Sequence, residues 1–558
     1  MKKNKLYSMI SAALLAAGMG MSSCADSLDL APIDWYGSGN FWTTEAQAIG
    51  NISAQMATLR GYNEQNTRYY GEYRGGTYVT VGSDGAQLHN TAIIEQNISE
   101  TNYGKSNFGG YWKAIADANL FIYMIKDSEI FAKEDTKNYC LGIAHGLRAY
   151  YYFTMYRNYG GVPLRLLPEV ENGNYDVSTL YKARAKASEV MAQIKADIKA
   201  SLDYFGNQTT FNFNNSSSNA KYYWSKAATE MLAGEVYLWN AKVAVGDQAA
   251  TPADLQAAKT YFENVVKNYN LSLQPTFAEV FSKERSNEII LAFPYSETET
   301  TNPLPVLCMY NIVTGGSTLG VAYDINGNIF DNIDQVSKAC QVNNQYSNAL
   351  WYQFDAEDSR RDVTLTSSWY DADVTRLKGT FVRKFLGTIS NATGYKNFDA
   401  DQPVYRLPLA YLSLAEIANM EGDNDKVEEY INLIRERAYG KNWDADKYAY
   451  EAGSFLENEV AILREKDKEF VQEGQRWYDV RRMTSVKNGA DTDHLVFCNE
   501  GSIAYGLEIT SNMKEVAEKE LVVKPVLDKQ YAYRVLWPLS ASDLSSDKEL
   551  TQTPGYEM

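Results

Sequence analysis

Histidine and cysteine are scarce in this sequence. Its 558 residues include 3 His and 5 Cys, which leaves little material for imidazole or thiolate chemistry. The sequence contains no HExxH zinc motif, no GxSxG nucleophile elbow and no CxxC pair. Gly104-Lys105-Ser106 ends like a phosphate-binding loop, but position 99 is Ser where that loop requires Gly. The familiar zinc, serine-hydrolase and P-loop motifs are therefore excluded.

Positive charge is also in short supply. Lys and Arg number 53 against 70 Asp and Glu, which gives a formal net charge of −17. An acidic chain repels phosphate backbones and anionic lipid headgroups. The composition therefore argues against nucleic acid as a partner.

Long apolar runs are absent except at the N-terminus. Three lysines fall within the first five residues, a mostly apolar run follows from Leu6 to Met21, and Ser22-Ser23-Cys24 comes next. A basic start, a short apolar run and small residues before Cys are typical of a bacterial lipoprotein signal. We expect cleavage before Cys24, which would become the lipidated N-terminus; a simple secretory signal is the alternative.

This start divides the chain into a signal peptide at 1–23, a lipidated N-terminus and tether at 24–40, and a single domain at 41–558. Cleavage would change the net charge from −17 to −20, because the signal carries three Lys and no acidic residue. No later run reaches the roughly 18 apolar residues that indicate a membrane span. Lipid is therefore the only membrane attachment that the sequence predicts.

Paired amphipathic helices are the dominant pattern of the mature chain. Apolar residues recur at three- and four-residue steps in neighbouring segments separated by short polar breaks, which indicates helix–turn–helix units of tetratricopeptide type. The segments are 138–159 with 186–205, 224–239 with 255–269, and 407–420 with 427–438. We predict a mainly α fold: tetratricopeptide-like helix pairs as a scaffold, with long loop-rich insertions and a few short strands. One strand candidate is 288–293.

Smaller features receive structural interpretations. His145 lies in a helical pattern and is interpreted as a hydrogen-bonded structural histidine. Asp423-Asn424-Asp425 is interpreted as a solvated turn between helices, because the spacing of a calcium loop is missing. The cysteines other than Cys24 allow three disulfide pairings, among which sequence cannot choose; they are Cys140, Cys308, Cys340 and Cys498.

Tyrosine is abundant, at 42 residues against 20 Phe and 10 Trp. Many tyrosines lie in long polar stretches, above all 61–110 and 295–403, and long loops in compact proteins are usually functional. Aromatic faces stack on sugar rings, and planar polar groups bond sugar hydroxyls. Local chemistry therefore nominates a set of ligand-binding residues, with buried packing as the alternative for each: Tyr70, Tyr73, Arg74, Tyr78, Asp84, Trp369 and Tyr370.

Several motifs, in order along the chain, carry a family resemblance. They are Phe41-Trp42-Thr43-Thr44-Glu45-Ala46, Leu147-Arg148-Ala149 with Tyr159-Gly160-Gly161-Val162-Pro163-Leu164, Asp358-Ser359-Arg360-Arg361, Ile431 to Ala438, Glu473-Gly474-Gln475-Arg476-Trp477, and Thr553-Pro554-Gly555-Tyr556. With the lipoprotein start, they make the chain resemble the SusD/RagB family of outer-membrane nutrient-binding lipoproteins. Gly161 replaces the usual Asp, and the 358–361 turn lacks its Pro. The 473–477 segment is interpreted as a tight turn with buried packing, in which a carboxylate binds Arg476.

The resemblance implies a lipid-anchored protein on the extracellular face of the outer membrane. It would bind oligosaccharides without cutting them and without a cofactor. It would also act as the hinged lid of a SusC-like TonB-dependent transporter, which takes up the captured glycan. The alternatives are the same role for peptides, a secreted glycoside hydrolase, or a helical-repeat scaffold that binds only proteins.

Overall fold

The structure is a computed structural model. It describes residues 41–556 except 81–87, 169–179, 212, 214–220, 283–285, 307, 311–320, 338–339, 341, 343 and 517–519. The predicted signal peptide at 1–23, the tether at 24–40, Cys24 and Asp84 lie outside the described residues.

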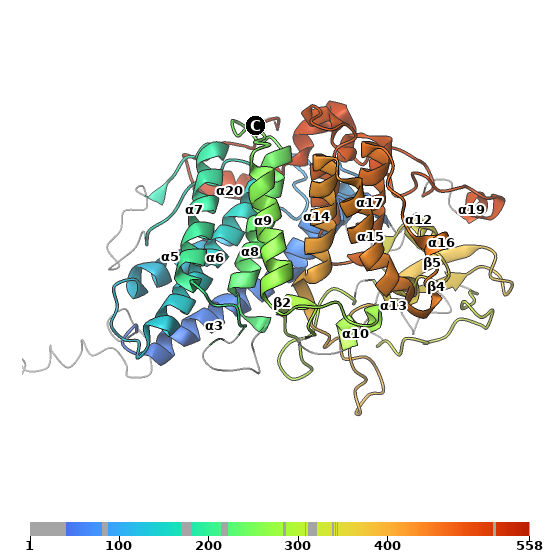
Figure 1. Ribbon diagram of the computed structural model, residues 1–558, viewed down its shortest axis with the longest axis horizontal. Helices are drawn as coiled ribbons and strands as arrows, with labels where there is room; N and C mark the ends of the chain where they lie inside the picture. The colour runs from blue at the N-terminus through green and yellow to red at the C-terminus, as the bar shows by residue number, and fades with distance from the viewer. Residues whose placement is uncertain are drawn as a thin grey trace, which may run out of the picture.

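Long helices stand side by side across most of the molecule (Figure 1). Their bounds are α3 (Glu45–Gly61), α5 (Tyr111–Ile125), α6 (Glu134–Tyr159), α7 (Ala187–Phe205), α8 (Lys226–Lys242), α9 (Asp254–Asn268), α14 (Leu407–Glu421), α15 (Asn424–Tyr439) and α17 (Phe455–Glu469). Helix α6 packs on α7, α8 on α9, and α14 on α15, while α9 also contacts α14 and so joins two of the pairs. The three predicted helix pairs are confirmed.

Strands are few and short, as predicted. Among the described residues they form three antiparallel sheets of two strands each. The pairs are β1 (Tyr78–Thr80) with β3 (Asn344–Tyr346), β2 (Ile289–Phe293) with β6 (Gln402–Arg406), and β4 (Leu365–Trp369) with β5 (Leu377–Val382). The strand predicted at 288–293 is β2, and all five of its residues are buried. The prediction of a mainly α fold with a few short strands is confirmed.

Short helices occupy much of the sequence between these elements. The α-helices are α4 (Leu88–Ile94), α10 (Phe277–Ser282), α12 (Asn348–Tyr352), α13 (Ser359–Thr364), α16 (Ala445–Tyr448), α18 (Arg476–Arg482), α19 (Ser511–Val516) and α20 (Ala541–Ser546). The π-helix η1 (Gln65–Glu72) is followed by the 3₁₀ turns η4 (Gly440–Asn442), η5 (Asp491–Asp493), η6 (Leu495–Phe497), η7 (Asn499–Gly501) and η8 (Lys529–Val535). The stretch 61–110 thus contains η1, which packs against α18. No helix in the described part of the chain is both long and apolar enough to span a membrane.

The structural interpretations of single residues are confirmed. His145 Nδ1 lies 2.9 Å from Asp197 Oδ1, and that carboxylate also binds Arg148. Asp423 caps α15 by accepting a hydrogen bond from the Lys426 amide. The four cysteines of the described residues are unpaired: Cys140, Cys308 and Cys340 are buried, and Cys498 is half-buried.

The turn at 473–477 brings two backbones into close contact. A Cβ on Gly71 in η1 would lie 2.3 Å from the Gly474 carbonyl oxygen, closer than atoms can approach. Gly474 itself has φ +78°, a conformation that favours glycine. The next turn of chain is fixed by Arg476, whose Nη1 donates to Asp467 Oδ1 in the buried interior. The predicted tight turn with a carboxylate-bound Arg476 is confirmed.

We expect Gly71→Ala to destabilise the fold by about 2–3 kcal/mol, because backbone atoms must shift to make room for the methyl group. The matched control is Gly50→Ala in α3, where a Cβ meets nothing within 4 Å. That change should stabilise the protein by about 0.5–1 kcal/mol, since Ala favours the helix. Urea unfolding of both variants checks the pair, and equal midpoints would contradict the close contact.

Candidate functional site

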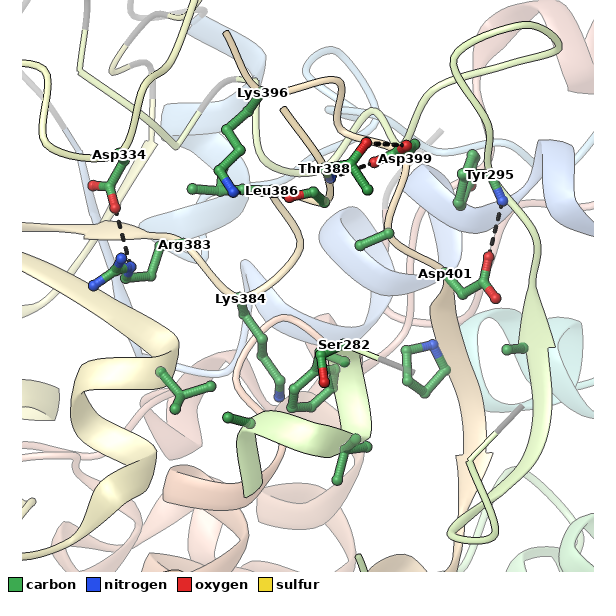
Figure 2. Close-up of a pocket in the computed structure, with 18 of the residues that line it drawn as sticks. Ser282, Tyr295, Asp334, Arg383, Lys384, Leu386, Thr388, Lys396, Asp399 and Asp401 are labelled. Atoms are coloured by element: carbon green, nitrogen blue, oxygen red, sulfur yellow. Dashed lines mark hydrogen bonds and ion pairs between the residues drawn. The ribbon is translucent and has the colours of Figure 1, made fainter. Parts of the chain in front are cut away.

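A cavity of about 770 Å³ opens beside the sheet β2–β6. Helix α10 and the two strands form one side of it, and two loop segments, 333–335 and 383–401, form the other. Figure 2 shows side chains from these segments surrounding the open space. The volume lies within the 300–1,000 Å³ typical of small-molecule sites.

The side formed by regular structure is largely apolar. Val280 of α10 packs against Ile289 and Ala292 of β2 in a small buried cluster, and Phe281 covers its edge. Ile289 and Ala292 are three positions apart, and the pairing of β2 with β6 is irregular between them, as at a β-bulge, which changes the direction of a side chain. Apolar surface is therefore held in place by the scaffold itself.

Carboxylates on the loop side are bound by protein donors. Asp399 accepts hydrogen bonds from the Thr388 amide at 2.7 Å and from its hydroxyl at 2.6 Å. Asp401 accepts from the Tyr295 amide at 3.2 Å and from the Tyr222 hydroxyl at 2.7 Å (Figure 2). The first two bonds close the loop between Thr388 and Asp399, and the other two connect Asp401 to Tyr295 and Tyr222.

Asp334 is a buried carboxylate at the opposite end of the cavity in Figure 2. It accepts a hydrogen bond from Thr366 at 2.6 Å and pairs with Arg383 Nε at 3.0 Å. Burial raises the pKa of its carboxyl, while the positive charges of Arg383 and Lys396 oppose that rise. Arg383 is therefore the cation in direct contact with this aspartate.

Lys384 lines the cavity, but its ammonium group is hydrogen-bonded to buried protein groups. Its Nζ donates to the main-chain carbonyls of Glu469 and Val471 at 3.1 and 3.2 Å and to the Glu473 carboxylate. Burial lowers the pKa of its ammonium group to about 8. Lys384 is therefore a structural link between the cavity wall and the helical core.

The arrangement suits recognition of a ligand with both apolar and hydroxyl-bearing faces. One wall offers apolar side chains, and the loops offer carboxylates, hydroxyls and ammonium groups. No group of three His, Cys, Asp or Glu side chains within the described ranges is placed to hold a metal ion.

Comparisons with known proteins show to which family the chain belongs. A family model described as "SusD family" matches residues 328–556, and a second, described as "Starch-binding associating with outer membrane", matches residues 37–238. A crystal structure of a SusD superfamily protein from Bacteroides fragilis is 43% identical, covers 93% of this chain and 100% of that chain, and superposes with a TM-score of 0.82. This chain belongs to the SusD family.

Other similar proteins support membership of the SusD family. NanU from Bacteroides fragilis is 29% identical, with 95% of this chain and 100% of that chain covered and a TM-score of 0.75. The curated SusD-like protein P38 from Formosa agariphila is 30% identical over 200 residues, which is 36% of this chain and 37% of that protein. That match thus spans little more than a third of the curated relative's length. A laminarin-binding SusD-like protein shares the fold at 17% identity, with a TM-score of 0.63.

Most of the ligand residues nominated from sequence lie in the core of this SusD-family protein. Tyr70 and Tyr73 are fully buried, and Tyr78 is 4% exposed. The Tyr70 hydroxyl lies 2.6 Å from the Tyr159 hydroxyl, and the rings of Tyr73 and Tyr78 meet at 4.8 Å. Tyr70 packs η1 against α6, and Tyr73 and Tyr78 join the end of η1 to β1, so their placement does not support ligand contact.

Arg74 and Trp369 are also buried. The guanidinium of Arg74 lies 4.1 Å from the centre of the Trp477 ring and donates to Gln96 at 3.0 Å. Trp369 is 6% exposed and donates its indole N–H to Ser367. Neither residue lines the cavity, and their placement likewise does not support a role in binding.

Tyr370 is the exposed member of the set among the described residues, at 46% of its surface. It follows directly after β4, and Arg376 and Lys378 lie over its ring at 5.5 and 5.2 Å. It does not line the cavity. Its role as a sugar platform stays a prediction.

Charged side chains are more numerous than aromatic ones in the cavity lining, so a nomination based mainly on aromatic residues does not include them. Most of them nonetheless fall within the predicted loop-rich stretch 295–403. A usable signal was the density of charged residues near its end: Arg383, Lys384, Lys396, Asp399 and Asp401 lie within 19 positions. Charge clustered in a polar loop is more informative here than tyrosine content.

Proposed function

We propose that this SusD-family protein captures oligosaccharides at the cell surface and delivers them to a SusC-like TonB-dependent transporter as its hinged lid. In this proposal lipid on Cys24 anchors it to the extracellular face of the outer membrane. Family membership supports the role, and the cavity of about 770 Å³ beside β2–β6 is the observation that carries it.

The cavity walls match the chemistry of a sugar. A pyranose ring presents C–H faces and a rim of hydroxyls. The apolar side chains of α10 and β2 fit the C–H faces, while the loop segments supply polar partners for the hydroxyls. A volume of this size holds a few sugar units.

The same walls favour binding over cleavage. Glycoside hydrolysis needs one carboxyl group to protonate the leaving oxygen and a second to act as base or nucleophile. Asp399 and Asp401 each accept two hydrogen bonds from the protein. Asp334 is paired with Arg383 and Thr366. These aspartates shape the loops, and we expect no hydrolysis.

The test is titration calorimetry of the mature chain with Cys24→Ser against plant, fungal and host glycans, with a casein digest alongside. We expect heat from one glycan class and unchanged chain lengths afterwards. Shortened chains would indicate a hydrolase, binding of the digest alone would indicate peptides, and silence throughout would favour a scaffold. Purification of the lipidated chain from outer membranes then tests for a co-purifying transporter.

Filling the cavity should abolish glycan binding. Ala278 is an exposed residue of α10 that lines the cavity, so Ala278→Trp places an indole in the ligand's space. We expect at least a hundredfold loss of affinity by calorimetry with an unchanged melting temperature. The matched control is Ala54→Trp on the exposed side of α3, and equal effects of the two changes would place the ligand elsewhere.

Tyr370→Ala tests the prediction made from sequence. If the exposed ring serves as a peripheral platform, its removal should weaken binding by about 0.5–1.5 kcal/mol, the magnitude of an aromatic contact. Tyr103→Ala, another exposed tyrosine at 36%, is the control. An unchanged dissociation constant for Tyr370→Ala would remove Tyr370 from the site.

A further inference from the structure

The cavity contains positive and negative side chains that differ in how they are satisfied. Within the described residues its lining includes four aspartates, one of which is Asp362, and four cations. Asp334, Asp399 and Asp401 accept the hydrogen bonds given above, and Asp362 pairs with Arg361 at 2.9 Å. All four carboxylates therefore already have protein donors.

Three of the cations keep unused donors. Among the described residues, Lys396 Nζ donates to the Gly387 carbonyl at 2.9 Å, and Lys221 Nζ donates to the Ser286 carbonyl at 2.6 Å. Each ammonium group carries three N–H bonds, so further donors remain on both. Arg383 uses Nε for Asp334 and Nη1 for the Asp362 carbonyl at 3.3 Å, and its Nη2 has no acceptor in the described part of the chain.

Lys221 is a buried cation without a carboxylate partner among the described residues. It is 8% exposed, and its partners are a main-chain carbonyl and the Phe211 ring at 5.2 Å. A buried ammonium without a counter-ion is costly, because desolvation is not repaid by a neighbouring negative charge. Burial accordingly lowers the pKa of Lys221 to about 8. An anion in the cavity would supply the negative charge that Lys221 lacks.

Lys396 and Arg383 form a more accessible donor pair. Arg383 pairs with Asp334, the positive charge of Lys396 also lowers the pKa of that carboxyl, and both cations line the cavity. The Arg383 side chain is 40% exposed, so its free Nη2 can reach an incoming group. An ammonium group and a guanidinium N–H are both charged donors from which a carboxylate or a sulfate can accept hydrogen bonds.

We propose that the cavity selects an anionic glycan, whose carboxylate or sulfate accepts hydrogen bonds from Lys396 and Arg383, with the buried Lys221 supplying further positive charge in the wall. This inference rests on the proposed function and narrows its ligand class. The chain's overall negative charge does not oppose it, because charges beyond about 8 Å are largely screened at physiological salt. Local donors therefore decide the selection.

The test compares ligands that differ only in charge. Trigalacturonate and its fully methyl-esterified form are titrated against the mature chain with Cys24→Ser. Digests of alginate, hyaluronan, chondroitin sulfate and neutral plant and fungal glycans are run beside them. We expect an anionic member to bind at least tenfold more tightly than its neutral counterpart, with affinity falling as salt rises. Desulfated and carboxyl-reduced chondroitin distinguishes sulfate from carboxylate recognition.

Variants connect the preference to the proposed residues. Lys396→Met should reduce affinity for the anionic glycan about tenfold and leave affinity for neutral glycans unchanged. The matched control is Lys226→Met, because Lys226 Nζ also donates to a main-chain carbonyl, that of Gly206 at 2.7 Å, but lies outside the cavity lining. Melting temperatures confirm that both variants fold.

The outcomes separate the inference from the proposed function. Binding of a neutral glycan alone, or an anionic preference that Lys396→Met leaves intact, would overturn the inference and keep the glycan-binding role. Failure of every glycan, neutral and anionic, would overturn both.

Discussion

Arg406→Met is expected to destabilise the protein by about 3–5 kcal/mol, the usual cost of removing one member of a buried ionic network. Arg406 is 1% exposed at the end of β6. Its guanidinium binds Glu469 at 2.5 Å, Glu473 at 2.7 Å and Glu288 at 3.1 Å. Met has a similar length without charge, so the change leaves carboxylates buried with one counter-ion fewer.

The network explains why the effect should be large. Glu469 of α17 also binds Arg437 of α15 and Arg360 of α13, and it is fully buried. Burial alone would raise the pKa of Glu469, but the charges of Arg437, Arg406 and Arg360 hold it well below its usual range. A lowered folded-state pKa contributes stability that is present at neutral pH and is lost as pH falls below about 4.5.

The matched control is Arg376→Met. Arg376 pairs with Asp371 at 3.3 Å on the surface, and 44% of its side chain is exposed. Exposed pairs of this kind contribute about 0–1 kcal/mol. Urea unfolding at pH 7 compares the two variants. A midpoint for Arg406→Met that matches the control would mean that the buried carboxylates find other partners or take up protons without cost.

The sequence predicted the scaffold well because its helices are long and regularly amphipathic. Segments such as 255–269 repeat apolar residues with the period of an α-helix, and that period can be recognised in a single sequence. The strand at 288–293 was recognised from a short apolar run of the kind that buried strands show. Both signals are local, so no knowledge of distant contacts was needed.

The site resisted prediction because it depends on distant contacts. The cavity is lined by Lys221, α10, β2 and the 383–401 loop. No spacing in the sequence indicates that these segments lie close together in the fold. Tyr70 and Tyr370 look alike in sequence, yet the first is fully buried and the second is 46% exposed. Burial of a polar-tipped aromatic is set by packing, and composition alone cannot distinguish the two cases.

The ionic network shows the same limit. Arg406 and Glu469 are 63 positions apart and bind each other in the core. Charged residues are rarely buried unless paired, so a sequence analysis places them on the surface by default. The carboxylate that binds Arg476 is Asp467, nine positions away; the prediction that a carboxylate binds Arg476 did not say which one.

Glu72→Gln is expected to stabilise the protein by roughly 3–4 kcal/mol at pH 8 and by less than about 1 kcal/mol at pH 5, since one pKa unit corresponds to about 1.4 kcal/mol. Glu72 is 2% exposed at the end of η1. Burial raises the pKa of its carboxyl to about 8, although the Gly474 amide and the Tyr346 hydroxyl oppose that rise. The folded protein therefore keeps Glu72 protonated at pH values where the unfolded chain has lost that proton.

The sign follows from proton linkage. Between about pH 4.5 and 8 the folded state binds one proton more than the unfolded state at this residue, so rising pH withdraws stability. Gln has the shape of the protonated acid and does not titrate. In the wild-type protein the Gly474 amide lies 2.8 Å from Glu72 Oε1, and the Tyr346 hydroxyl lies 3.3 Å from Oε2. The carbonyl of Gln can still accept from the Gly474 amide, and its side-chain amide can donate to the Tyr346 hydroxyl.

The measurement is urea unfolding of both proteins from pH 5 to pH 8, with Glu263→Gln as the control for a surface carboxylate. Glu263 pairs with Lys267 at 2.6 Å along α9, where the Lys267 side chain is 65% exposed, and its loss should change stability by no more than about 0.5 kcal/mol at any pH. The difference between Glu72→Gln and wild type should grow steadily with pH. A constant difference across this range would mean that Glu72 is ionised in the fold, and that Lys384 and Arg476, the cations near it, outweigh its burial.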